Sequence, residues 1–238
     1  MSKRAVVLAG GQGTRLRPYT VVLPKPLMPV GDYPILEIIV RQLASQGFDH
    51  ITLAVNRQAN LIEAFFGDGK PWRVRIDYSI ESRPLSTIAP LCLIDDLPEV
   101  FLLMNGDVLT DLDFSDLFQK HVAGDGVFTI AATTRNHLID YGVLQTDAGG
   151  ALVRFQEKPS MSYLVSMGVY VMHRSVLAEV PRGVPYGFDD LMRDLLATGG
   201  TIRVVRHNGY WLDIGRPDDY ARAIDEFEQQ KQFLMPHG

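Results

Sequence analysis

A short apolar segment that runs directly into a glycine-rich segment constrains the fold of this chain most. Residues 5–8 are all apolar, the pattern of a strand that is covered on both faces of a sheet. Gly10, Gly11 and Gly13 follow almost at once. Because glycine lets the backbone turn tightly and lets N–H groups approach a phosphate closely, the pattern predicts a buried strand that ends in a phosphate-binding loop.

The rest of the first half alternates between strand and helix patterns. We expect strands at residues 51–55, 74–80 and 100–104, and helices at residues 35–46, 59–66, 89–95 and 115–123. This alternation is typical of parallel βαβ units. Prolines recur between residues 18 and 34, so this stretch is expected to be a long loop.

The second half has a mixed pattern. A β-hairpin is expected from residues 141–146 and 151–156, further strands at 128–133 and 167–172, and a pairing of 202–206 with 210–214. Helices are expected near 176–180 and 188–197, with a terminal helix from 217 to about 233. We therefore predict one domain over residues 1–238, an α/β fold with a doubly wound, mostly parallel central sheet and a small mixed β insertion on the substrate side.

Composition and charge exclude several classes of partner. The formal net charge of -5 argues against a general affinity for nucleic acid or anionic membranes. No apolar stretch reaches transmembrane length, the N-terminal apolar run is too short for a signal peptide, and the lone Cys92 cannot form an intramolecular disulfide. We expect a cytoplasmic protein with small-molecule substrates. Whether apolar helix faces pack internally or across a homodimer stays open.

The glycine spacing matches neither of two common nucleotide-binding motifs. A P-loop would end in Gly-Lys-Ser/Thr, and a dinucleotide fingerprint would place a third glycine where Leu16 stands, which argues against a hydride-transfer enzyme. Arg15 and Lys25 supply positive charge near the loop. Asp107 closes an apolar strand, where ligands of open α/β sheets gather. Asp213 is a second carboxylate in an apolar setting, which a metal ion would stabilise.

Residues 8–16, Leu-Ala-Gly-Gly-Gln-Gly-Thr-Arg-Leu, and the following Pro24-Lys25-Pro26 resemble the signature of the sugar-1-phosphate nucleotidyltransferases, in particular mannose-1-phosphate and heptose-phosphate guanylyltransferase-like members. Segments at residues 141–143, 155–159, 167–170 and 210–215 match the family in order. The resemblance implies a Rossmann-like, glycosyltransferase-A-like fold. It also implies Mg²⁺-dependent transfer of a nucleoside monophosphate from an NTP to a hexose or heptose 1-phosphate, with release of pyrophosphate.

The resemblance also implies roles for individual residues. Arg15, Lys25 and Asp107 would be catalytic, and Asp107 and Asp213 would hold Mg²⁺. Nucleotide binding would fall to Leu8, Ala9, Gly10, Gly11, Gly13, Thr14, Glu81, Leu85, Ser86, Thr87 and Gly106. Sugar-phosphate binding would fall to Tyr141, Gly142, Glu157, Lys158, Ser166 and Gly168. The chain ends after one predicted helix, so we expect no β-helix domain and no acyltransferase activity.

Three positions depart from the family pattern. Ser86 and Ala89 replace glycines near the base, and Ser166 replaces an asparagine near the sugar. The base and the sugar are therefore open. Glu81 favours GTP, because a carboxylate accepts from both N1–H and N2–H of guanine whereas uracil offers one such donor. A uridylyl- or thymidylyltransferase is the alternative, and a catalytically silent nucleotide-sugar-binding regulator is a second.

Overall fold

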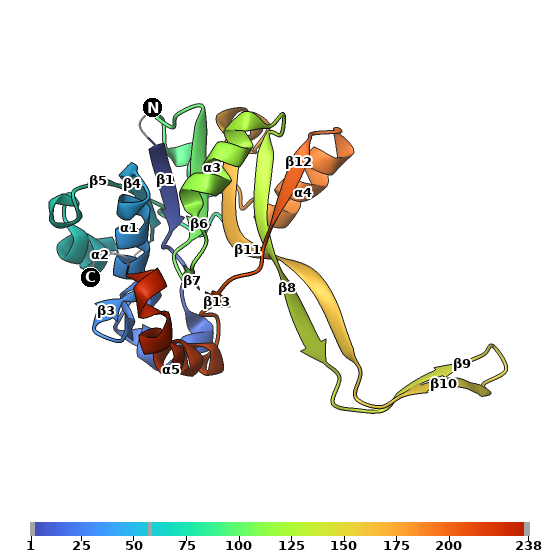
Figure 1. Cartoon of the computed structure of the whole chain (residues 1–238). Coiled ribbons are helices and arrows are strands. Elements are labelled where there is room, and N and C mark those ends of the chain that lie inside the picture. The colour runs from blue at the N-terminus through green and yellow to red at the C-terminus, as the bar shows by residue number, and fades with distance from the viewer. Residues whose placement is uncertain (1–2, 57–58, 236–238) are drawn as a thin grey trace.

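A seven-stranded sheet forms the centre of the computed structural model, which describes residues 3–56 and 59–235 (Figure 1). The strand order is β12-β8-β11-β6-β1-β4-β5. The strands are β1 Lys3–Leu8, β4 Phe48–Val55, β5 Arg75–Ile80, β6 Val100–Asn105, β8 Phe128–Leu138, β11 Ser160–His173 and β12 Ile202–His207. β11 runs antiparallel to both of its neighbours, and the other neighbouring strands run parallel. The α/β, mostly parallel sheet predicted from the sequence is confirmed.

Both faces of the sheet are covered, which explains the continuous apolar strands. Ala5 and Val7 of β1 join one core cluster, and Val6 joins the other. The first cluster includes side chains of α1 Ile35–Ser45, α2 Ala59–Phe66, α3 Phe114–Ala123 and α5 Pro217–Leu234. The second includes side chains of the short 3-10 helices η5 Ala89–Leu93 and η6 Arg174–Leu177 and of α4 Phe188–Ala197. Alternate residues of each buried strand thus serve opposite layers.

The proline-rich stretch forms the irregular segment that the sequence predicts. It contains the 3-10 helices η1 Thr14–Leu16, η2 Tyr19–Val21 and η3 Lys25–Leu27, followed by the short pair β2 Pro29–Val30 and β3 Tyr33–Pro34. A further 3-10 helix, η4 Lys70–Trp72, precedes β5. The expected helices at 89–95 and 176–180 are also single 3-10 turns, η5 and η6, each packed on the second core cluster rather than extended into an α-helix.

The expected pairing of residues 202–206 with 210–214 is wrong. β12 instead pairs in parallel with β8 at the sheet edge, where it finds a continuous ladder of backbone partners. β13 Trp211–Asp213 pairs antiparallel with β7 Val108–Thr110. Sequence proximity favours a hairpin, but the edge of a long strand offers β12 more hydrogen bonds than three residues of β13 could.

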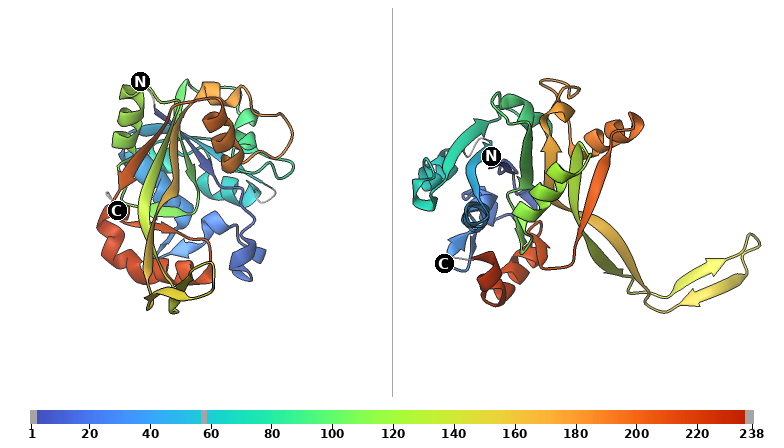
Figure 2. Two further views of the ribbon diagram at one scale, coloured as in Figure 1. Left: turned by 90° about the vertical axis from the view of Figure 1, so that its right-hand side faces the viewer. Right: turned by 45° about the horizontal axis from the view of Figure 1, so that its top comes forward.

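Two strands continue beyond the body of the sheet and form an arm, residues 134–164 (Figures 1 and 2). Its proximal part is the antiparallel pair of β8 and β11, and its distal part is the hairpin of β9 Val143–Thr146 and β10 Leu152–Gln156. The predicted hairpin is therefore confirmed. The strands that lead to it are longer than the apolar runs at 128–133 and 167–172 indicate.

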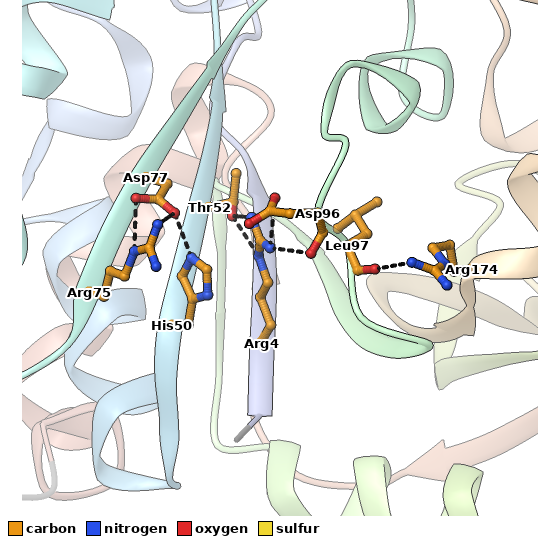
Figure 3. A network of polar contacts seen from close by, with 8 residues as sticks. All are labelled: Arg4, His50, Thr52, Arg75, Asp77, Asp96, Leu97 and Arg174. Carbon is orange, nitrogen blue, oxygen red and sulfur yellow. Dashed lines mark hydrogen bonds and ion pairs between the residues drawn. The ribbon is translucent and has the colours of Figure 1, made fainter. Parts of the chain in front are cut away.

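A polar network lies near the amino ends of the parallel strands (Figure 3). Arg4 is 4% exposed, and its guanidinium donates to Thr52 Oγ1 at 2.8 and 3.0 Å and to the carbonyl of Asp96 at 2.9 Å. On the neighbouring strands, His50 pairs with Asp77 at 2.7 Å. These bonds satisfy a buried charge, so this end of the sheet carries structural polar groups. Among the described residues, no helix is both long and apolar enough to cross a membrane.

Candidate active site

The glycine loop follows directly from the end of β1. Leu16 N donates to the carbonyl of Gly13 at 2.9 Å, and Thr20 Oγ1 donates to the same carbonyl at 2.7 Å. Gly13 has φ 59°, and a Cβ there would lie 2.8 Å from Thr20 Cγ2 and 3.3 Å from Lys25 Cβ. Only glycine fits both the left-handed backbone and the space. Gly13 therefore shapes the turn that carries Arg15 and Lys25.

Lys25 and Asp107 meet although 82 residues separate them. The ammonium of Lys25, which is 7% exposed, makes a short hydrogen-bonded ion pair with Asp107 Oδ2. Gly106 N donates to the carbonyl of Leu8 at 2.9 Å, so the segment after β6 is held against the end of β1. The two motifs that the sequence singled out thus form one site at the carboxyl ends of the parallel strands.

Asp213 reaches the same site through the β13–β7 pair. Asp213 is the register partner of Val108, and Ile214 N donates to the carbonyl of Asp107 at 3.0 Å. Burial raises the pKa of the Asp213 carboxyl, the negative charge of Asp107 raises it further, and Lys25 opposes both effects. Arg15 also lies close, because a Cβ on Gly215 would be 3.5 Å from its guanidinium nitrogens. Two carboxylates and two cations therefore converge from four segments.

Asp107 and Asp213 are the residues of this site that could hold a divalent metal ion. Asp107 Oδ1 is buried and has no hydrogen-bond partner in the described part of the chain. Leaving a buried charged acceptor unpaired is costly, and the repulsion between Asp107 and Asp213 adds to that cost. No group of three or more His, Cys, Asp or Glu within residues 3–56 and 59–235 is arranged to hold a metal. Two carboxylates suit Mg²⁺, which usually keeps several waters and binds substrate phosphates as well.

A pocket of about 390 Å³ opens between the glycine loop and Asp107. Its lining residues are Leu8, Gly10, Gly11, Gln12, Ala54, Val55, Ser79, Glu81, Pro84, Ser86, Thr87, Pro90, Asn105 and Asp107. The predicted nucleotide-binding residues Leu8, Gly10, Gly11, Glu81, Ser86 and Thr87 are among them, whereas Ala9, Gly13, Thr14, Leu85 and Gly106 are not. The sequence did not predict Gln12 and Asn105 as pocket residues, although Gln12 lies within the glycine segment and Asn105 directly precedes Gly106 and Asp107. No sequence signal marks Ser79 or Pro90.

Glu81 is held at this pocket by the chain that follows it. Its Oε2 accepts from Leu85 N at 3.1 Å, and its Oε1 would lie 3.1 Å from a Cβ on Gly10. Burial raises the pKa of the Glu81 carboxyl, and the bond from Leu85 N opposes that rise. Oε2 of Glu81 therefore holds the segment at Leu85 in place, while Oε1 lies beside Gly10 of the glycine loop.

Ser86, which stands where the family pattern has a glycine, adopts a left-handed backbone conformation. Its φ is 70°, in the left-handed region, where a non-glycine residue is strained by about 1–2 kcal/mol. Flanking bonds hold it there, since Tyr186 N donates to the carbonyl of Leu85 at 3.0 Å and Phe188 N donates to Thr87 Oγ1 at 2.8 Å. The loop thus tolerates a non-glycine residue here, and Ser86 lines the pocket with a hydroxyl-bearing side chain.

The predicted sugar-phosphate residues fall into two groups. Ser166 and Gly168 lie in the body, and a Cβ on Gly168 would be 2.5 Å from Asn105 Nδ2. Tyr141, Gly142, Glu157 and Lys158 lie on the arm, which projects away from the glycine loop (Figure 1). Lys158 there pairs with Asp140 at 2.9 Å, with both side chains exposed. The structure places Gly168 against Asn105, two residues before Asp107, and leaves the second group on the projecting arm.

Comparison with known families identifies the family of this chain. The family model described as nucleotidyl transferase matches residues 4–230, nearly all of the described chain. The chain belongs to this family. The resemblance in the sequence motifs to sugar-1-phosphate nucleotidyltransferases is thereby confirmed.

Curated nucleotidyltransferases similar to this chain differ in the nucleotide that their names give. A glucose-1-phosphate uridylyltransferase of Synechocystis is 32% identical over 93% of this chain, and a mannose-1-phosphate guanyltransferase of Schizosaccharomyces pombe is 35% identical over 91%. This chain spans 62% of the length of each of these two relatives.

Solved structures share the fold of this nucleotidyltransferase. A putative glucose-1-phosphate thymidylyltransferase from Bacillus anthracis, in complex with a sucrose, superposes with a TM-score of 0.77 at 22% identity and 94% coverage of both chains. HddC from Yersinia pseudotuberculosis, complexed with GMP-PN, superposes with a TM-score of 0.71 at 24% identity, covering 94% of this chain and 99% of that one.

Proposed function

We propose that this chain is a magnesium-dependent sugar-1-phosphate nucleotidyltransferase. It transfers a nucleoside monophosphate from an NTP, with GTP preferred, to a hexose or heptose 1-phosphate and releases pyrophosphate. The observation that carries the proposal is the convergence of Lys25, Asp107 and Asp213 beside the glycine loop, with one buried oxygen of Asp107 lacking a hydrogen-bond donor among the described residues.

The chemistry demands charge neutralisation more than proton transfer. A phosphate monoester is already mostly dianionic near neutral pH, because its second pKa is about 6, so the attacking oxygen needs no general base. Attack at the α-phosphorus brings an anion to a polyanion. Positioning and electrostatic stabilisation are therefore what the protein must supply.

The residues of the site can divide this work. The Lys25 ammonium has three donors, so it can keep its bond to Asp107 and still donate to an α-phosphoryl oxygen. Arg15 lies at Gly215 and offers a planar guanidinium suited to the β- and γ-phosphates. Asp107 and Asp213 would hold Mg²⁺, which when bound supplies positive charge to the triphosphate.

The preference for GTP rests on Glu81. Its carboxylate faces the pocket and has acceptor capacity beyond the bond from Leu85 N. Guanine offers two adjacent donors to such a group and uracil offers one. A uridylyl- or thymidylyltransferase remains the alternative, as does a catalytically silent nucleotide-sugar-binding regulator, because the same pocket would serve each.

Further expectations from the sequence stay predictions. They are a single domain over residues 1–238, a cytoplasmic location, and small-molecule substrates without nucleic-acid or membrane partners.

Pyrophosphate release tests the proposed function. GTP, UTP, dTTP, CTP and ATP are each combined with hexose, amino-sugar and heptose 1-phosphates in the presence of magnesium. One pair should give turnover, Asp107→Asn should lower it by on the order of 10²-fold to 10³-fold, and Asp116→Asn, the same change at an exposed ion pair, should not. NTP binding in a thermal-shift assay without turnover for any pair would instead support the regulator.

A further inference from the structure

The proximal part of the arm is a regular ribbon that leads away from the body. β8 and β11 pair without interruption from Thr134 and Leu164 to Leu138 and Ser160, and Ile139 N extends the ladder with a 3.0 Å bond to the carbonyl of Pro159. The irregularity in this pair lies between Ser166 and Tyr170, inside the body. The right-hand view in Figure 2 shows the ribbon leaving the sheet.

This geometry separates Lys158 from the Asp107 of its own chain. Gly168 abuts Asn105, but Ser160 lies six residues before Ser166 along an extended strand, a span of about 20 Å at roughly 3.3 Å per residue. Glu157 and Lys158 lie still farther out. The ladder is interrupted between the ribbon and the distal hairpin, and the chain could bend there. Such a bend would move the hairpin, but Lys158 would stay at the far end of the ribbon.

Lys158 itself has an unusual backbone. Its φ is 42°, in the left-handed region that a lysine seldom occupies. Strained residues of this kind gather at sites that bind ligands. The conformation points to a use for this segment beyond a surface turn.

The arm also exposes an apolar surface that a monomer would leave in water. Large apolar side chains along it are 45–78% exposed, among them Tyr141, Phe155 and Tyr163. These three rings alone expose on the order of 350 Å², taking roughly 200 Å² for each. The aliphatic side chains bring the total to the order of the ~800 Å² that one partner buries in a stable complex. An isolated two-stranded ribbon is otherwise marginal in water.

A second exposed apolar surface borders the glycine loop of the same chain. Tyr19 and Val22, four and seven residues after Arg15, are 57% and 77% exposed. They line a groove of about 510 Å³ together with Met28 and Tyr220. The arm and this groove lie on different parts of one chain. In a dimer with two-fold symmetry, the arm of each copy can therefore cover the groove of the other.

We propose that two copies of this chain exchange arms, so that Glu157 and Lys158 of one copy complete the substrate site at Asp107 and Asp213 of the other. The apolar side chains of each arm lie against the partner's groove beside the glycine loop. Lys158 adds a cation where two carboxylates and the substrate phosphates meet. This inference rests on the proposed function and assigns half of its sugar-phosphate site to a second subunit.

Subunit complementation tests the exchange. Lys158→Ala and Asp107→Asn chains carrying different tags are co-expressed, and the mixed dimer is purified through both tags. Each variant alone should lose at least about 10²-fold in activity. In the mixed dimer one of the two sites pairs an intact Asp107 with an intact Lys158, so activity should return to about half that of the wild type. A mixed dimer of Asp107→Asn and Asp213→Asn is the matched control and should stay inactive, because both of its sites are damaged.

The outcomes separate the two proposals. Wild-type protein that is inactive on every substrate pair would refute the proposed function. Active wild-type protein with an inactive mixed dimer, full activity of Lys158→Ala alone, or an active wild-type monomer in sedimentation would each overturn the arm exchange. As a second readout, Leu144→Asp, at an exposed position of the arm, should shift sedimentation from dimer to monomer and lower activity together.

Discussion

Gly168 links the backbone of β11 to the carboxylate site, and replacing it by alanine tests that link. Its φ is 73°, which costs an alanine about 1–2 kcal/mol. The new Cβ would also lie 2.5 Å from Asn105 Nδ2 and 3.0 Å from Asn105 Cγ, an overlap that typically costs a further 1–3 kcal/mol. Gly168→Ala should therefore lower the free energy of unfolding by about 2–5 kcal/mol. Because Asn105 lies two residues before Asp107, nucleotidyl transfer should also fall by on the order of 10²-fold.

Gly199→Ala provides the matched control. Gly199 has the same φ of 73°, and within the described structure no atom beyond its two neighbours in the chain lies within 4 Å of its Cβ position. It should lose only the backbone cost of about 1–2 kcal/mol and keep its activity. Urea unfolding and the pyrophosphate assay are run on both variants. Gly199→Ala reports the backbone strain alone, whereas Gly168→Ala reports the strain together with the displacement of Asn105. Equal effects of the two substitutions on both measurements would refute the reasoning.

Three further substitutions probe charge and recognition. Asp213→Asn relieves the repulsion with Asp107, so it should raise the free energy of unfolding by about 0.5–2 kcal/mol. Activity should nevertheless fall at least about 10²-fold, because a charge of the site is lost. A loss of stability in urea would contradict this. Burial lowers the pKa of His121 below its usual 6.5. As the pH falls below 6.5, the His121 imidazole is therefore protonated in the unfolded chain before it is protonated in the folded one. Stability should then decrease toward acid pH, and His121→Gln should flatten that slope in urea titrations; an unchanged slope would contradict it. Glu81→Gln should lower kcat/KM for GTP by about 10–100-fold and affect UTP less, and equal losses would remove Glu81 from base selection.

The sequence predicted the part of the site that local patterns encode. The apolar residues of β1 require a strand covered on both faces, and the glycines after it fit a turn that other residues would strain. Asp107 stands two residues after the end of β6, so its position at the carboxyl ends of the parallel strands follows from strand order. The roles of these residues in catalysis stay predictions until they are measured.

Long-range pairing is what the sequence did not reveal. The partner of β13 is β7, about a hundred residues earlier, and nothing local favours it over the neighbouring β12. The arm was also missed, because the sequence at 138–164 does not distinguish apolar residues that stay exposed from those of strands that pack in a body. Their exposure becomes evident only when the ladder of β8 and β11 is seen to continue beyond the sheet.

The path of the nucleotide phosphates tests the central claim most directly. The protein is incubated with magnesium, the active sugar 1-phosphate and GTP labelled at either the α- or the γ-phosphate, and the products are separated. The account predicts that the α-label enters the nucleotide sugar, that the γ-label appears in pyrophosphate, and that Asp107→Asn abolishes both. Transfer of the γ-label to the sugar, or unchanged product formation by Asp107→Asn, would contradict it.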